Sequence, residues 1–185
     1  MCSIRCLIAT GCVILSVGLP VATAQTEVTL DALPQAITPD VKLTVNRLVT
    51  AGRLKEAIPY LEELIHRFDQ AKGAKFDQEL ERLYYLLGAA WMQSEDYESA
   101  AEVLEKSAAR FPTSNDSTTV LDWLGDCYRV MEEFRKAAAT YEKLRTQHSL
   151  KPAQRDDVMA KESICLVHLE DWEKAADLMD AAVTS

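Results

Sequence analysis

The chain has 185 residues, 48% of them hydrophobic, which is enough for one domain with a substantial buried core. Its 29 acidic side chains outnumber the 20 basic ones, so its formal net charge at pH 7 is −9. This charge argues against binding to nucleic acid, because phosphate contacts need a cationic surface. It also disfavours docking on the anionic face of a membrane.

Residues 1–24 differ from the rest of the chain and have the composition of a signal peptide. They contain one charged side chain and a continuous apolar stretch, and small residues precede the bond between Ala24 and Gln25, where we predict cleavage. A retained membrane anchor is the alternative, but the apolar stretch is shorter than the roughly 20 residues that a spanning helix needs. The sequence therefore predicts an exported protein, periplasmic or extracellular after cleavage. Residues 25–37 are expected to form a lead-in to a first helix that begins at Thr38.

One pattern of leucine, glycine, aromatic and alanine residues occurs twice in the middle of the chain. Gly88 follows a leucine, precedes an aromatic residue by three positions, and stands twelve positions before the alanine pair that begins at Ala100. Gly125 has the same kinds of neighbour at the same spacings, with its alanine pair beginning at Ala137. The two copies are 37 residues apart, a period in the range of helical repeat proteins.

Weaker copies of the pattern occur at both ends of the chain. Their alanines are Ala57 and Ala175, but Val45 and Ser163 stand where the glycine is expected. Successive alanine positions are 43, 37 and 38 residues apart, so we expect an insertion in the first interval, near residues 72–75.

The spacing of apolar residues agrees with stacked helices. Between Leu80 and Trp91 they recur every three or four positions, which places them on one helical face. A glycine inside a helix costs roughly 1 kcal/mol relative to alanine, so two glycines at equivalent positions indicate close helix packing.

These residues resemble the pattern of the tetratricopeptide repeat family, and the resemblance covers most of the chain. It implies an all-α solenoid of about four helix-turn-helix repeats in a right-handed superhelix, forming one domain over residues 38–185. The repeats are expected at about residues 38–71, 81–114, 118–151 and 156–185.

Members of this family usually bind ligands in a concave groove lined by the first helix of each pair. The resemblance therefore implies a groove with an apolar, aromatic centre at Tyr85 and Met92 and acidic side chains toward the third repeat. A partner protein or peptide with an apolar anchor and basic residues would suit this groove; the alternative is an ordinary solvated surface. The implied lining residues are Lys42, Asn46, Val49, Arg82, Tyr85, Ala89, Met92, Gln93, Asp122, Asp126, Arg129, Asp157, Ile164 and His168.

Lys42 and Asn46 also match two positions of a carboxylate clamp found in chaperone-binding members of the family. The remaining clamp positions hold Leu86, Thr119 and Trp123, none of which supplies the required group. The clamp is therefore incomplete, and we do not expect a terminal carboxylate as the ligand.

The sequence offers no candidate set of catalytic residues. Cys127 and Cys165 are expected at equivalent buried positions about 8–10 Å apart, beyond the reach of a disulfide, so we predict free thiols. The three histidines show no metal-ligand spacing, and no phosphate loop or nucleophile motif occurs. We therefore predict neither a metal nor a cofactor, and no enzymatic activity.

The expected function is that of an extracytoplasmic scaffold that binds a partner protein or peptide, without nucleic acid and without a membrane span after cleavage. The alternative is a structural or self-associating repeat module, or the N-terminal part of a longer envelope protein. In that alternative a homodimer would form through an exposed C-terminal edge at Trp172 and Met179, where no capping helix follows in the sequence.

Overall fold

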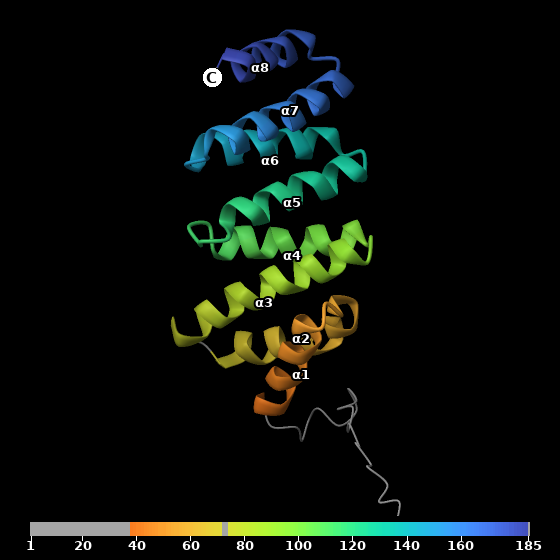
Figure 1. Cartoon of the computed structure of the whole chain (residues 1–185), viewed down its shortest axis with the longest axis vertical. Helices are drawn as coiled ribbons and strands as arrows, with labels where there is room; N and C mark the ends of the chain where they lie inside the picture. Colours follow the sequence, from red (N-terminus) through yellow and green to blue (C-terminus); the bar gives the residue numbers. More distant parts are fainter. Residues whose placement is uncertain (1–37, 72–73, 185) are drawn as a thin grey trace, which may run out of the picture.

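The structure, a computed structural model, describes residues 38–71 and 74–184, and these ranges form eight α-helices and no strand. The helices are α1 (Thr38–Thr50), α2 (Leu54–Ala71), α3 (Ala74–Gln93), α4 (Tyr97–Arg110), α5 (Ser117–Val130), α6 (Phe134–Gln147), α7 (Pro152–His168) and α8 (Trp172–Thr184). They lie one above another in chain order along the long axis of the molecule, with α8 at the top (Figure 1). The predicted all-α repeat fold is therefore confirmed.

The predicted signal peptide (1–24) and lead-in (25–37) lie outside the described residues. Within the described ranges, none of the helices combines the length and the apolar character needed to cross a bilayer.

Two helix pairs begin several residues ahead of the repeat starts expected from the sequence, and the third pair begins within one residue of its expected start. α3 begins at Ala74, seven residues before position 81, and has 20 residues where α5 has 14. Part of the expected insertion therefore extends the amino-terminal end of α3. α7 begins at Pro152, at a position where the missing N–H of proline costs no helical hydrogen bond.

The turn inside each helix pair has the same backbone conformation in all four repeats. The residues with positive φ are Gly52, at 71°, and Glu95, Glu132 and Glu170, at 61°. The next amide donates to a carbonyl five residues back, as from Glu133 to Tyr128 at 2.8 Å, in the manner of a Schellman motif. Left-handed backbone favours glycine, so the three glutamates carry a conformational cost that the sequence pattern does not reveal.

Close packing explains the two glycines at equivalent positions. A Cβ atom on Gly88 would lie 2.7 Å from Leu104 Cδ2, and one on Gly125 would lie 2.7 Å from Tyr141 Cζ. Leu104 and Tyr141 are fully buried, so a larger residue at either glycine must displace core side chains. The small residues of the repeat pattern thus allow the two helices of each pair to approach each other.

Candidate protein-binding face

All the expected lining residues lie on α1, α3, α5 and α7, and we call the surface over the gaps between these helices the odd-helix face. In the first gap, between α1 and α3, Lys42 Nζ lies 3.3 Å from Glu79 Oε1, and Arg82 Nη2 donates to Asn46 Oδ1 at 3.5 Å. A hollow of about 100 Å³ lies beside these pairs. The polar groups expected in the first repeat are thus already engaged with side chains of the second.

An aromatic pair fills the gap between α3 and α5. The Tyr85 ring stacks on the Trp123 ring, with centroids 4.9 Å apart and planes inclined by 26°. Both rings are half-buried, so they present aromatic surface to solvent as well as joining two repeats. Met92, in contrast, packs against the core, and its sulfur accepts a hydrogen bond from Cys127 Sγ at 3.1 Å. Tyr85 therefore shares the centre of this face with Trp123, a residue that the sequence indicated only as a break in the carboxylate clamp.

The gap between α5 and α7 contains Lys161, which the sequence did not indicate as a site residue. Lys161 Nζ lies 2.7 Å from Asp122 Oδ1, 3.2 Å from Asp126 Oδ2 and 3.3 Å from Asp157 Oδ2. Burial acts to lower the pKa of Lys161, but the hydrogen bonds and charges of Asp122 and Asp126 raise it above its usual value. Burial also raises the pKa of the Asp122 carboxyl, against the opposing effect of Lys161. One cation thus holds three carboxylates together, and the cluster keeps a net negative charge.

Asp126 lies on the inner side of this cluster. It accepts hydrogen bonds from Tyr141 Oη at 2.9 Å and from Arg129 Nη2 at 3.1 Å. Arg129 Nε is buried and has no hydrogen-bond partner. Because its oxygens already have three donors, Asp126 is suited to a structural role, which leaves Asp122 and Asp157 as the acids available to a ligand.

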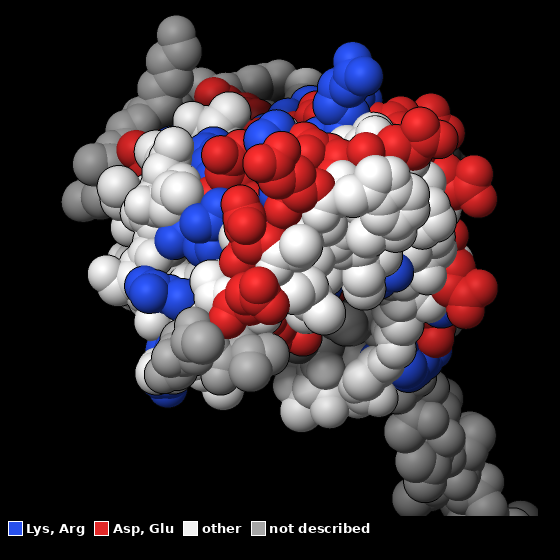
Figure 2. All heavy atoms as spheres, turned by 90° about the horizontal axis from the view of Figure 1, so that it is seen from above, with Lys and Arg blue, Asp and Glu red and all other residues white. Residues whose placement is uncertain are grey.

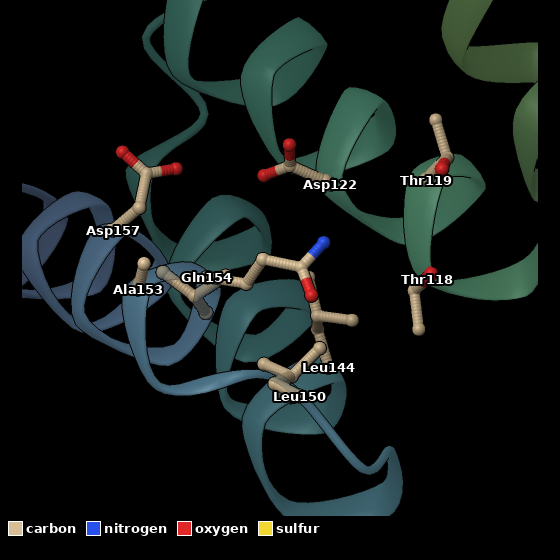
Figure 3. A pocket seen from close by; sticks show the side chains of 9 residues that line it. Thr118, Thr119, Asp122, Leu144, Leu150, Ala153, Gln154 and Asp157 are labelled. Carbon is tan, nitrogen blue, oxygen red and sulfur yellow. The ribbon is translucent and has the colours of Figure 1, made fainter.

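Asp122 and Asp157 border a hollow of about 240 Å³ near the amino-terminal ends of α5 and α7. The two carboxylates lie near each other on one side of it, and the Gln154 amide lies below Asp122 (Figure 3). Leu144 and Leu150 contribute an apolar part of the lining. An apolar base with carboxylates at the rim suits a long basic side chain, whose methylene stem packs while its charged end is hydrogen-bonded.

Two of the three expected residues of the fourth repeat, Ile164 and His168, lie elsewhere. Ile164 is 49% exposed and, with His168, Trp172 and Met179, lines a separate hollow at the C-terminal end of the array. The His168 ring stacks on Phe134, with centroids 4.0 Å apart and planes inclined by 1°. Two kinds of surface are therefore present, the odd-helix face and this end surface.

Cys127 and Cys165 are both fully buried and unbridged, as the repeat spacing predicted. Burial raises the pKa of the Cys127 thiol to about 12 and that of Cys165 to about 11. Both thiols are therefore protonated at neutral pH, which is consistent with a packing role.

Comparison with known proteins agrees with the geometry. Tetratricopeptide repeat families match residues 43–115 and residues 119–150. The chain belongs to the tetratricopeptide repeat family. Repeats of this family generally mediate protein–protein interaction and are typically not catalytic. No curated protein shows significant sequence similarity to the chain.

Solved structures with a similar fold include BtubC (BKLC) from P. vanneervenii, with a TM-score of 0.62 and 17% sequence identity. That match covers 82% of this chain and 63% of BtubC, so the chain spans less than two thirds of the length of this protein. A putative kinesin light chain with nearly identical TPR-like repeats from Podosopora anserina has a TM-score of 0.44 and 14% identity, covering 79% of this chain and 92% of the other. At 17% identity the likeness to BtubC shows the fold alone.

Proposed function

We propose that this tetratricopeptide repeat protein is an exported adaptor that binds a segment of a partner protein along its odd-helix face. The segment carries an apolar or aromatic residue that contacts the Tyr85–Trp123 pair. A lysine or arginine of the same segment enters the hollow that Asp122 and Asp157 border, beside Lys161. The partner is therefore a protein with an exposed, basic and partly apolar stretch.

The observation that carries this proposal is the position of the aromatic pair beside the acidic hollow. Trp123 and Asp122 are neighbours on α5, and both project toward gaps between odd helices, one shared with α3 and the other with α7. A half-buried aromatic pair offers apolar contact area, and buried aromatic anchors supply much of the energy in protein interfaces. The carboxylates add a preference for a basic residue at a defined distance from the anchor.

Export is supported by the composition of residues 1–24 and by the small residues before Gln25. Mass spectrometry of the protein purified from its producing cells tests this part of the proposal. We expect a mature chain that begins at Gln25. A chain that retains residues 1–24 and sediments with membranes would show an anchor instead.

Selection from a random peptide library on the purified protein tests the binding face. We expect enriched peptides to place an aromatic or aliphatic residue near a lysine or arginine. Tyr85→Ala and the double variant Asp122→Asn with Asp157→Asn should each weaken these peptides by about tenfold or more, the size of a typical anchor contact. Glu98→Gln, at an exposed carboxylate on α4, is the matched control and should have no effect. Enriched peptides that bind all these variants equally would contradict the proposal.

A second candidate function, self-association, is favoured by one observation. Trp172 is 62% exposed and Met179 is 50% exposed, and both line one apolar hollow. Light scattering of the purified protein over a range of concentrations distinguishes the two functions. A monomer at every concentration would exclude self-association, and a concentration-dependent dimer would support it.

A further inference from the structure

One position of the second helix of each repeat lies four residues after the first alanine of the repeat pattern, and in the inner repeats it packs between one repeat and the next. In the first three repeats it is held by Leu61, Leu104 and Tyr141, all with 0% exposure. Tyr141 shows the reason, because it packs against Gly125 of its own repeat and lies under Lys161 of the next, 5.9 Å from the ring centroid. The equivalent residue of α8 is Met179, which is 50% exposed. Met179 thus has the position of a core residue, but no described helix covers it.

The surroundings of Met179 repeat this pattern. Ala101 and Ala138 are buried at one position of α4 and α6, whereas Ala176 at the same position of α8 is exposed. We call the surface formed by Ile164, Val167, Trp172, Ala176 and Met179 the end face. It contains an almost wholly apolar hollow of about 370 Å³. The end face thus has the residues that join each repeat to the next in the inner repeats, and one more helix could pack on it.

The charge around the end face restricts the net charge of a helix that could pack on it. Residues 152–184 contain eight acidic and three basic side chains, a net charge of −5 that is more than half of the −9 of the whole chain. Glu173, Asp177 and Asp180 are exposed on α8, and the view onto this end shows uncharged surface bordered by acidic side chains (Figure 2). Two copies joined through their end faces would bring these like charges together, which is unfavourable.

Stacking of copies end to end is disfavoured by α1. At the position where α3, α5 and α7 carry the fully buried Ala90, Cys127 and Cys165, α1 carries the exposed Arg47. The outward surface of α1 is therefore unlike a first helix that packs onto a preceding repeat.

We propose that the end face is a docking site for a basic amphipathic helix of a partner protein. The helix lies where the first helix of a following repeat would lie, with its apolar stripe over Trp172 and Met179. Lysine or arginine residues beside the stripe pair with the acidic border on α8. This site is separate from the odd-helix face, so the protein can hold two segments at once.

Fluorescence anisotropy with two labelled synthetic peptides tests the proposal on the purified protein. The peptides are amphipathic helices that share one stripe of Leu and Ala and differ only in having Lys or Glu beside it. We expect the Lys peptide to bind at least about tenfold more tightly than the Glu peptide, with a preference that falls as salt is added. Absence of binding by the Lys peptide, or equal binding of both peptides, would overturn the proposal.

Matched variants locate the binding. Met179→Ser should weaken the Lys peptide by about tenfold or more, because it removes an apolar contact from the centre of the site. Leu43→Ser changes an apolar side chain on α1 that is also 50% exposed and should have no effect. Tyr85→Ala should likewise leave binding unchanged; if it abolishes binding while Met179→Ser does not, the peptide lies on the odd-helix face and the end-face proposal is wrong.

Two further measurements identify other occupants. A concentration-dependent dimer in light scattering that Met179→Ser abolishes would make a second copy the occupant and overturn the proposal. A fall of more than about 5 °C in the Tm of Met179→Ser would mean that part of the same chain already covers the face, because an exposed substitution has little effect on stability. A monomer whose Tm is unchanged by this substitution is the expected result.

Discussion

The two ends of the helical array have the same fold but opposite surface chemistry. α1 presents Asp40, Thr44 and Arg47 at the positions where α5 has the buried residues Val120, Leu124 and Cys127. α8 instead keeps apolar residues at the positions that the inner repeats bury. At these positions one end is therefore polar, whereas the other has the apolar residues of an internal interface. The comparison teaches that position in the array, as much as residue type, decides whether an apolar side chain is core or binding surface.

The largest expected effect comes from placing the same charge at equivalent positions inside the array and at its end. Leu104→Asp should destabilise the protein by about 4 kcal/mol or more, because it buries a carboxylate without a partner. Met179→Asp should change the free energy of unfolding by less than about 0.5 kcal/mol, since the side chain is half exposed. Urea denaturation followed by circular dichroism measures both. Similar losses in the two variants would show that the C-terminal end is covered in solution.

The next comparison is between the ion pairs of Lys161, on α7, and of Lys42, on α1. Lys161→Met should cost about 1–3 kcal/mol at pH 7, because it leaves Asp122 partly buried without its cation and Asp126 with Arg129 alone. Lys42→Met should cost less than about 0.5 kcal/mol, because Lys42 and Glu79 are more than a third exposed. Chemical denaturation of both variants at pH 7 measures the difference. Equal costs would contradict the distinction between the two lysines.

The Lys161→Met deficit should also depend on pH. Burial raises the folded-state pKa of Asp122, and the variant loses the group that opposes this rise. The folded variant then binds protons more readily than its unfolded chain, so its stability deficit should shrink as the pH falls from 7 toward about 4. A deficit that grows on acidification would refute this assignment.

A smaller effect is expected where the inner repeats have glycine and the last repeat does not. Gly125→Ala should destabilise the protein by about 1–2 kcal/mol, because the new methyl group meets the buried Tyr141 ring. Gly88→Ala should cost less, since it meets the end of a leucine side chain. Ser163→Ala, at the equivalent position of α7, loses only a hydrogen bond to the Met159 carbonyl and should cost about 0.5–1 kcal/mol. Thermal unfolding of the three variants measures the order of their losses in stability.

The smallest expected effect is a gain in stability at the turns. Glu170 has a φ of 61° where the first repeat has Gly52, so Glu170→Gly should stabilise the protein by about 0.5–1 kcal/mol. Gly52→Glu should have the opposite effect. Differential scanning calorimetry measures both, and a loss of stability in Glu170→Gly would show that its side chain makes a contact that outweighs the backbone cost.

Local spacing explains which features the sequence predicted. The equivalent glycines, the alanine pairs and the buried cysteines all follow from a pattern that each repeat carries within itself. The Tyr85–Trp123 pair and the contacts of Lys161 with Asp122 and Asp126 join residues from different repeats, so they depend on how one repeat is rotated on the next. The only local signal for this cluster was the spacing of four residues between Asp157 and Lys161. The left-handed glutamates had no local signal, because glutamate is not typical of that conformation.

By itself, the sequence determined the repeat, its all-α fold and the set of residues that fill the space between paired helices. It could do so because helical periodicity and the need for small residues at close contacts are properties of short segments. The sequence also predicted an exposed edge at Trp172 and Met179, which are 62% and 50% exposed. Only the tertiary structure decided which side chains of different repeats meet and what surrounds this edge. Met179, Tyr141 and Leu104 occupy one position in the pattern, and what separates them is whether a described helix packs on the far side. The exposure of an apolar position is set by its neighbours in space, and for Met179 that exposure creates the end face.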